Sequence, residues 1–403
     1  MRICLVYDCL YPHTVGGAER WYRSLAERLV ADGHEVTYLT LRQWARGVDP
    51  GVPGVDVRAV GPRMQLYSGA GRRRVLPPLI FGLGVLAHLT RYGRRYDAIH
   101  ADSFPYFSLL AVAATRPRGR YSVTVDWFEV WSRDYWREYL GTVGGSIGWL
   151  VQALCARVPQ RAFCFSNLHA ERLQAVGLRG ELTTLSGLAE LSTADVEGAG
   201  PREPESPASV VVYAGRHIPE KRVPAIVPAV ARARQTIPQL TASIIGDGPE
   251  RYKVIEEVER LGLRDVVDVP GFVTTAVVHS SLANALCLVL PSRREGYGLV
   301  VVEAAACGTP SVVVAGPDNA AVELIVEGEN GFVAASSSSN DLAAAIVRVH
   351  QGGSALRSAT AAWFLRNVQR LSLDSSLESV VKSYSDQPGV ATSRDPMPDR
   401  DLS

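Results

Sequence analysis

Lysine is scarce in this chain of 403 residues, where only Lys221, Lys253 and Lys382 occur among 42 basic side chains. The preference for arginine indicates a coding bias, so a lysine inside a motif is less often there by chance. Basic and acidic residues nearly cancel, and the net charge of +1 excludes a general attraction to nucleic acid. The hydrophobic share of 47% is ordinary for a globular protein, and the length suits two or three domains.

The six cysteines form no CxxC pair and no other paired spacing. Four lie in apolar runs that predict buried strands or helices, which is typical of reduced thiols in a reducing compartment. No leader of the secretory type precedes the first strand-like run, residues 2–7. The apolar stretch 75–90 contains two prolines and is too short to span a bilayer. We therefore expect a cytoplasmic protein.

Several motifs of catalysis do not occur in the sequence. There is no GxxxxGK[ST] phosphate loop, no HExxH zinc helix, no GxSxG nucleophile turn and no metal-ligand spacing of His and Cys. A DxD triplet, Asp399 to Asp401, falls in a polar tail that we expect to be disordered, so we do not expect it to hold a metal. We predict that the protein needs no metal and no other cofactor.

Short β-branched runs alternate with helical patterns along the first half of the chain. Strands are predicted at residues 3–7, 35–40, 55–60, 98–101, 122–125, 162–165 and 182–185. Helices are predicted between them at residues 18–31, 106–114 and 168–176. This alternation is typical of a parallel sheet with helices on both faces.

A second alternation begins at Val210, after a break rich in proline and acidic residues. Strands are predicted at residues 210–214, 242–245, 266–269, 286–290 and 311–314. Helices are predicted at residues 223–236, 250–261, 275–285, 300–307, 341–350 and 355–371.

Two α/β domains of Rossmann-like type follow from this pattern, at 1–189 and 210–371, joined by a linker at 190–209. A helix at 372–385 could pack back on the first domain, and a tail occupies 386–403. Ligands bind at the carboxyl ends of parallel strands, so we expect the site in the cleft between the two sheets.

The string PSRREGYGLVVVEAAACGTP, at residues 291–310, is the most specific signal in the chain. It places Glu295 in a loop after a predicted strand and Glu303 in the following helix, so the two carboxylates can reach two groups of one ligand. Gly296 and Gly298 let the backbone approach closely and expose amides at a helix N-terminus, where anions bind. The alternative is a glycine loop with two solvated glutamates.

Three further turns follow predicted strands. Arg216 and Lys221 lie in GRHIPEK, where two positive charges suit a diphosphate, although a solvated basic loop is the alternative. The turn GDGP at 246–249 lets a ligand approach closely. The turn GGAE at 16–19 opens a helix and favours anions, but it is not GxGxxG and no acidic residue ends the second strand, which argues against a dinucleotide cofactor.

Together these motifs resemble those of the GT-B glycosyltransferases in the large retaining family numbered four. That family has GG near its N-terminus, a GR…K turn, a GxGP turn and the string PSxxEGxGLxxxEAxAxGxP, and all occur here in the same order. The resemblance covers the chain up to about Tyr384. It implies the GT-B fold, an α/β architecture in which two Rossmann-like domains with parallel sheets face a central cleft. It also implies a retaining, metal-independent transfer from a UDP- or GDP-sugar to a hydroxyl of a glycan, glycolipid or natural product.

The resemblance implies roles for individual residues. Arg216 and Lys221 would bind the donor diphosphate, Glu303 the ribose hydroxyls, and Glu295 the donor sugar; the two cations and Glu295 would also carry catalysis. Further donor-binding residues are implied at the glycine turns and strand ends: Gly16, Gly17, Gly246, Gly248, Gly271, Phe272, Gly296, Tyr297, Gly298 and Leu299.

Two strand ends depart from the family pattern, which has histidine in strings such as VHAH and TVH. Asp102 and Asp126 occupy these places here. We expect the Asp126 carboxylate to emerge in the cleft as a further catalytic residue, with a helix cap as the structural alternative. Asp102, Trp127, Glu129 and Trp131 are the acceptor-side candidates, because aromatic rings beside the cleft can stack on a sugar. Core packing is the alternative for the tryptophans.

Two other functions stay open: a donor-binding subunit of a heteromeric transferase that has lost catalysis, and a GT-B nucleotide-sugar epimerase. The expected partners are a nucleotide-sugar donor and a sugar, glycolipid or small-molecule acceptor. Arginines flank the apolar stretch and could hold residues 72–95 against an anionic membrane on its inner face, although a core helix with arginine-rich ends is the alternative.

Overall fold

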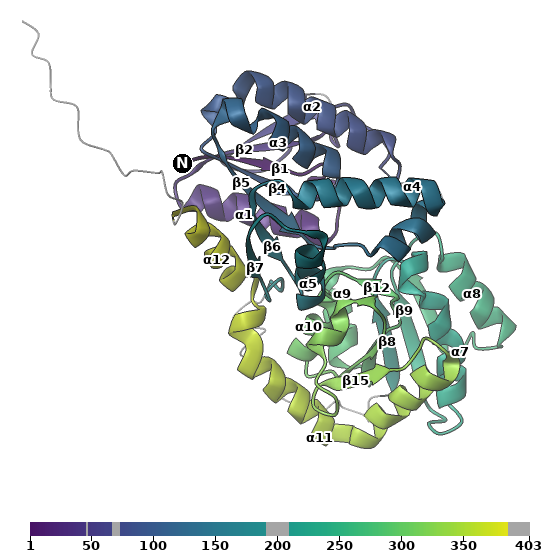
Figure 1. Ribbon diagram of the computed structural model, residues 1–403. Coiled ribbons are helices and arrows are strands. Elements are labelled where there is room, and N and C mark those ends of the chain that lie inside the picture. Colours follow the sequence, from purple (N-terminus) through teal and green to yellow (C-terminus); the bar gives the residue numbers. More distant parts are fainter. Residues whose placement is uncertain (46, 67–72, 191–208, 386–403) are drawn as a thin grey trace, which may run out of the picture.

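The computed structural model describes residues 1–45, 47–66, 73–190 and 209–385. Most of the predicted linker, the whole predicted tail 386–403 with its DxD triplet, and Arg72 lie outside the described residues. The described chain forms two α/β halves, one above the other in Figure 1.

The N-terminal half is built on a sheet of seven parallel strands in the order β3-β2-β1-β4-β5-β6-β7. The strands are β1 (Arg2–Val6), β2 (Glu35–Leu41), β3 (Val55–Gly61), β4 (Ala98–Asp102), β5 (Ser122–Trp127), β6 (Gln160–Cys164) and β7 (Gly180–Thr184). The central strands β1, β4 and β5 are almost continuously buried, as expected for parallel strands with helices on both faces.

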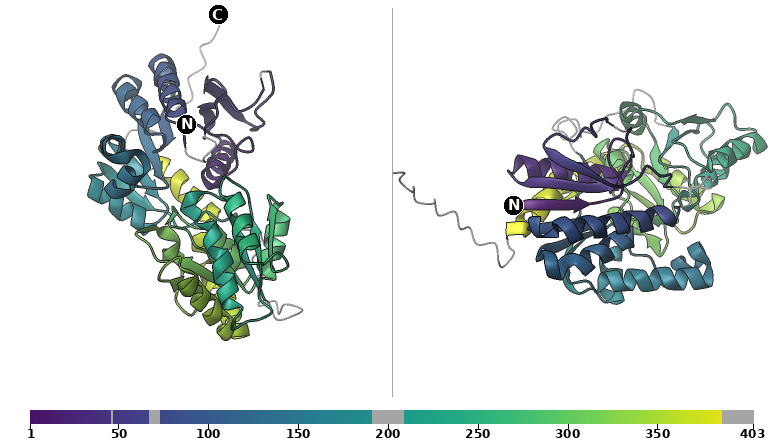
Figure 2. Two further views of the ribbon diagram at one scale, coloured as in Figure 1. Left: turned by 90° about the vertical axis from the view of Figure 1, so that its right-hand side faces the viewer. Right: turned by 90° about the horizontal axis from the view of Figure 1, so that it is seen from above.

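The helices of this half are α1 (Gly17–Ala31), α2 (Leu76–Tyr92), α3 (Tyr106–Gly119), α4 (Arg133–Ala156) and α5 (Asn167–Val176), with a short 3-10 turn, η1 (Gly93–Arg95), after α2. Helices α2, α3 and α4 pack in succession as an outer layer over the sheet, whereas α1 lies on the opposite face (Figures 1 and 2). Right-handed crossovers between parallel strands produce this division, because α1 is the one helix whose crossover runs back toward β2.

The C-terminal half has six parallel strands in the order β10-β9-β8-β11-β13-β15. They are β8 (Val210–Ala214), β9 (Thr241–Ile245), β10 (Val267–Gly271), β11 (Cys287–Leu290), β13 (Ser311–Val314) and β15 (Gly331–Ala334). A two-stranded ribbon joins β12 (Arg294–Glu295) to β14 (Asp318–Asn319). The helices are α7 (Ile226–Ala233), α8 (Arg251–Arg260), α9 (Thr275–Ala283), α10 (Leu299–Ala306) and α11 (Ser339–Leu371), with 3-10 turns η2 (Pro219–Lys221), η3 (Val223–Ala225) and η4 (Ala320–Leu324).

The chain crosses between the halves twice. It first passes from β7 to β8 through the region of the predicted linker. It returns through α11, which bends at Gly353 (φ 51°), and α12 (Leu373–Ser385) then packs against α1 in the N-terminal half. The Tyr384 hydroxyl lies 2.5 Å from Nδ1 of His100 on β4, so the last described helix is bonded to the first sheet.

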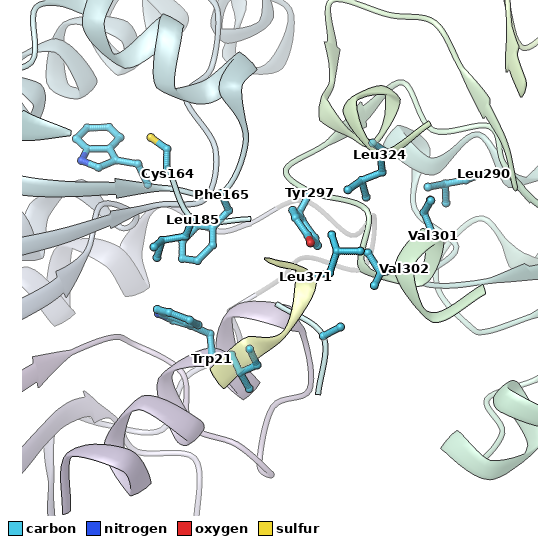
Figure 3. Close-up of a cluster of buried hydrophobic side chains, with 14 of the residues drawn as sticks. Trp21, Cys164, Phe165, Leu185, Leu290, Tyr297, Val301, Val302, Leu324 and Leu371 are labelled. Carbon is cyan, nitrogen blue, oxygen red and sulfur yellow. The ribbon is translucent and has the colours of Figure 1, made fainter. Parts of the chain in front are cut away.

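Buried side chains from both halves meet beneath the cleft (Figure 3). Trp21, Phe165 and Leu185 come from the N-terminal half, and Tyr297 from the C-terminal half donates its hydroxyl to the carbonyl of Ser186. The buried Tyr297 and its hydrogen bond thus connect the two halves, although each sheet has its own core.

The structure differs from the predicted elements in several places, including α2, which is absent from the predicted helices. No helix is predicted from the sequence at α4, because Gly141, Gly144, Gly145 and Gly148 weaken its helical pattern; Gly141 is itself non-helical and bends α4. The short strand β15 is not predicted either. β5 runs to Trp127, two residues beyond its predicted end, and this shift changes the position of Asp126.

Candidate active site

A cavity of about 500 Å³ lies between the two sheets at the carboxyl ends of their strands, and side chains from both halves line it. The structure places these predicted site residues on its wall: Gly16, Gly17, Asp102, Glu129, Trp131, Arg216, Lys221, Glu295, Gly296, Tyr297, Gly298, Leu299 and Glu303. Six predicted residues are not on that wall: Asp126, Trp127, Gly246, Gly248, Gly271 and Phe272.

Two helices begin at the cavity, one from each half. α1 starts after Gly16 and α10 starts after Gly298, and neither glycine provides a side-chain cap. Gly298 has φ 98°, a backbone conformation that favours glycine. The N-cap residue of each helix therefore supplies no side-chain acceptor to the first amides, and such N-termini favour anions.

Two cations stand beside these helix ends. Arg216 follows β8 and is exposed, and Lys221 ends the short turn η2. The Lys221 ammonium lies 2.5 Å from Glu295, which also accepts a hydrogen bond from the Ser292 hydroxyl at 2.7 Å. Positive charge and amide dipoles thus line the same cavity, an arrangement that suits a diphosphate.

Gly246 and Gly248, in the turn after β9, pack against the backbone of the turn that carries Arg216 and do not line the cavity. A Cβ at Gly246 would lie 1.9 Å from the carbonyl oxygen of Gly215, and one at Gly248 would lie 2.5 Å from that of His217. Two glycines thus let the ends of β8 and β9 pack closely, and the amide of His217 donates to Asp247 at 2.8 Å. The prediction that these glycines contact the ligand does not fit this arrangement, since backbone rather than open space lies against them.

Gly271 and Phe272 lie at the end of β10, away from the cavity wall. The Cβ position of Gly271 faces Arg251, and the Phe272 side chain is 80% exposed. Their predicted contact with the nucleotide base stays a prediction.

Two carboxyl groups on helices α1 and α10, both on the cavity wall, have raised pKa values. Burial raises the pKa of Glu303 on α10, although Arg20 and His279 act against it. Burial likewise raises the pKa of Glu19 on α1, and Arg216 opposes this shift from across the cleft. Both carboxylates are thus held near positive charge in a poorly solvated position, where hydroxyl donors of a ligand would stabilise the ionised form.

Aromatic rings and an ion pair form the acceptor-side wall. The Arg294 guanidinium lies 2.9 Å from Glu129 and stacks over the ring of Trp131, 4.6 Å from its centroid. The indole N–H of Trp131 also donates to Glu129 at 2.8 Å. Burial alone would raise the pKa of Glu129, but Arg294, His169 and this hydrogen bond outweigh it, and the pKa lies below its ordinary value. Glu129 therefore remains an anion bound to its neighbours.

Asp102 ends β4 on the same wall and is almost fully buried. Burial raises its pKa well above the ordinary value, despite a hydrogen bond of 3.3 Å from the amide of Phe104. Burial thus favours the protonated form of Asp102, and a protonated carboxyl group can donate a hydrogen bond as well as accept one. Close by, Arg73 forms an ion pair with Asp8.

The prediction that the Asp126 carboxylate emerges in the cleft is wrong in this structure. Asp126 lies within β5 rather than beyond its end, and its side chain is fully buried beneath α1. Its Oδ2 accepts a hydrogen bond from the indole of Trp21 at 2.7 Å and lies 2.9 Å from Nε2 of His100. Since the strand is longer than predicted, the pleat directs Asp126 into the core.

Trp127 points to the other face of β5, as the pleat requires. It is fully buried, and its indole donates to the side chain of Gln160 at 2.8 Å. The core-packing alternative therefore describes Trp127, whereas Trp131 lies on the cavity wall.

The cavity residues that the sequence interpretation missed include three charged ones, Glu19, Arg73 and Arg294. Glu19 was present in the GGAE turn but had no role assigned to it. Arg73 and Arg294 are two arginines among many, and no pattern separates them from surface residues. Among the described residues, no group of three or more His, Cys, Asp or Glu side chains is arranged to hold a metal ion.

Known proteins resemble the chain over both halves. Residues 15–185 match the family model described as Glycosyltransferase Family 4, and residues 201–361 match the model described as Glycosyl transferases group 1. An exopolysaccharide phosphotransferase of Streptomyces coelicolor is 33% identical over 175 residues, which are 42% of this chain but only 18% of that protein.

Two relatives cover more of the chain. The glycogen synthase of Mycobacterium tuberculosis is 26% identical over 372 residues, 86% of this chain and 85% of that protein. The crystal structure of Anabaena HepE in complex with UDP and glucose has a TM-score of 0.71 at 20% identity, covering 96% of this chain and 100% of that one. The two-domain architecture is thus the GT-B fold, as predicted.

Proposed function

Because the chain is a group 1 glycosyltransferase with the GT-B fold that uses a nucleotide-sugar donor, we propose that it is a retaining, metal-independent enzyme. It transfers a sugar from a UDP- or GDP-sugar to a hydroxyl group of its acceptor. One observation carries this proposal: two helix N-termini without side-chain caps and two cations, Arg216 and Lys221, converge on one cavity between the domains.

The donor diphosphate lies in this cavity, between the two helix N-termini and the two cations. The first amides of α1 and α10 donate hydrogen bonds to its oxygens, and Arg216 and Lys221 balance its charge. These groups stabilise the leaving nucleoside diphosphate, a task that a divalent cation performs in other transferases.

Glu303 and Glu295 hold the two ends of the donor. Glu303, on the buried wall of α10, accepts hydrogen bonds from the ribose hydroxyls. Glu295 accepts hydroxyls of the transferred sugar, while its bond with Lys221 fixes both side chains between sugar and phosphate. This pair connects substrate binding with stabilisation of the leaving group.

The reaction breaks the bond between the anomeric carbon and the phosphate oxygen. The acceptor oxygen attacks that carbon from the face on which the phosphate leaves, so the configuration is retained. The acceptor proton passes to an oxygen of the departing diphosphate. Neither a carboxylate nucleophile nor a protein base is required, and the enzyme acts by positioning and electrostatic stabilisation.

The acceptor approaches the wall of Trp131, Glu129 and Asp102. Trp131 offers a ring for stacking on a sugar, and the buried carboxyl of Asp102 offers a hydrogen bond to an acceptor hydroxyl. Arg294 sets the orientation of the ring and of Glu129 through its stacking and its ion pair.

The experiment that tests this function uses the purified chain with a panel of UDP- and GDP-sugars. Stabilisation in a thermal-shift assay identifies the donor, and slow hydrolysis or transfer by the chain alone identifies an active enzyme. Binding without turnover would favour the silent-subunit alternative. Interconversion of nucleotide sugars without transfer would favour the epimerase.

A further inference from the structure

The outer helices of the N-terminal half expose large apolar side chains in two rows. On α4 they are Leu140, Val143, Ile147, Leu150 and Leu154, with Val143 75% exposed. At the start of α2 and along it they are Val75, Leu76, Leu79 and Leu83, with Leu83 65% exposed. We call these nine residues the apolar surface. Among the residues that the structure describes, they include more than half of the exposed large hydrophobics.

From Val143 to Leu154 the row on α4 has the spacing of one helical stripe, because its members recur every three or four residues, and Leu140 precedes the bend at Gly141. The opposite stripe of the same helix is held in the protein core. Gln152 there is fully buried, donates to the carbonyl of Trp131 at 2.9 Å, and accepts from the indole of Trp136 at 3.2 Å. One face of α4 is therefore packed against the protein, whereas the apolar face opposite it is exposed to solvent.

α4 is long and apolar enough to cross a membrane by length and composition, and it is the one such helix among the described residues. Its bend at Gly141 and the hydrogen bonds of Gln152 keep it on the surface of the domain instead. The geometry fits a helix that lies in the plane of a bilayer surface rather than one that spans it.

The charges around the apolar surface are predominantly positive. Helices α2, α3 and α4 together carry five arginines and two carboxylates. One of these carboxylates, Glu138, pairs with Arg293 of the C-terminal half. From residue 139 to 156 the chain has no charged side chain. Exposed arginines lie at both ends of the layer: Arg74, Arg91, Arg94, Arg95, Arg118, Arg133 and Arg157. The protein as a whole is nearly neutral, so this positive charge is local.

The apolar surface begins at the acceptor side of the cavity. The backbone amide of Arg73 donates a hydrogen bond to the Tyr139 hydroxyl at 3.2 Å, and both residues line the cavity. The exposed apolar residues nearest to this contact along the chain are Val75 on one side and Leu140 on the other. An apolar chain lying along this surface would therefore have its polar end beside the acceptor wall.

We propose that helices α2 and α4 dock the protein on an anionic lipid bilayer and that the acceptor is a hydroxyl group on a lipid-linked molecule. The acceptor part rests on the proposed function, whereas the docking part does not. Apolar side chains enter the interface, and the surrounding arginines contact anionic headgroups. This extends the sequence prediction for residues 72–95, since α4 supplies the larger apolar row.

The test is sedimentation of the full chain with vesicles of phosphatidylcholine alone and with vesicles that contain phosphatidylglycerol, at low and physiological salt. We expect binding to the anionic vesicles that weakens as salt rises. The variant Val143→Glu/Ile147→Glu should lower the partition coefficient at least about tenfold. The matched control is Val326→Glu/Leu365→Glu, which changes exposed apolar residues of the C-terminal half and should bind as the wild type does.

Two control measurements accompany the sedimentation assay, and three outcomes would overturn the proposal in whole or in part. The melting temperature of each variant verifies folding, and hydrolysis of the nucleotide sugar in the absence of lipid should stay unchanged in the Val143/Ile147 variant. If the wild type sediments with neither kind of vesicle, the proposal is overturned even when the enzyme is active. A vesicle-independent dimer that the same variant abolishes would overturn it in favour of a second copy of the chain. Transfer only to water-soluble acceptors, with vesicle binding intact, would overturn the lipid-linked acceptor.

Discussion

Replacement of Asp126 separates a structural role from a catalytic one. Asp126→Ala removes the acceptor for Trp21 at 2.7 Å and the partner of His100 at 2.9 Å, and leaves both groups buried. Leaving a buried donor without its acceptor costs about 1 to 3 kcal/mol. In a domain of this size each kcal/mol lowers Tm by about 2 to 4 °C, so we expect a decrease of roughly 2 to 12 °C.

Turnover should respond differently, because Asp126 does not line the cavity. Measured well below the lowered Tm, kcat should stay within a few-fold of the wild type. Asp126→Asn keeps the shape and one acceptor oxygen, and should lower Tm by only a few degrees. It gives the comparison if the alanine variant does not fold. A Tm equal to the wild type together with a 100-fold loss of kcat in either variant would refute the structural assignment.

Three further changes test the donor site. Lys221→Ala should lower turnover by about 100-fold, because one stabiliser of the leaving group is lost. The control Lys253→Ala removes an exposed lysine on α8 outside the cavity and should leave turnover unchanged. Equal activity of the two variants would remove Lys221 from the mechanism. Activity should persist in excess EDTA, since Arg216, Lys221 and two helix ends provide the positive charge, and a complete loss that manganese restores would contradict this. Burial raises the pKa of Glu303. As the pH is lowered through that raised pKa, the carboxylate gains a proton and no longer accepts hydrogen bonds from both ribose hydroxyls. The affinity for the free nucleoside diphosphate should therefore fall. Calorimetric titration from pH 8 to pH 5 measures this, and in Glu303→Gln the dependence should flatten; an unchanged slope in that variant would assign it to another group.

The strands and the turns after them could be predicted from the sequence because their signals are local. The apolar runs of β1 and β11 are each followed by a motif that lines the cavity, GGAE at 16–19 and the string that begins at Pro291. Each motif is one uninterrupted stretch of the chain. Glu295, Glu303 and Lys221 are examples: each belongs to a short string whose residue types already indicate an anionic, hydroxyl-rich ligand.

Other parts of the site depend on contacts between distant residues. Arg294 is distinguished only by its position between Glu129 and Trp131, which are more than 160 residues away in the sequence. The role of Asp126 depends on two extra residues in β5 and on a histidine that is itself bonded to Tyr384. Pleating makes such a prediction sensitive, because a small change in where a strand ends decides whether a side chain meets solvent or core. The four glycines of α4 likewise hide a helix that tertiary packing stabilises.

The path of α11 and α12 has a consequence for synthesis of the protein. Ser372 pairs with Ala189, and α12 packs against α1, so the first domain is completed by a segment that is translated after the second domain. His100, which lies beside Asp126, has no bond to Tyr384 until the second domain has been translated. The order in which the chain is made therefore differs from the order in which its domains become complete, and the nascent first domain remains unfinished until the second has been translated.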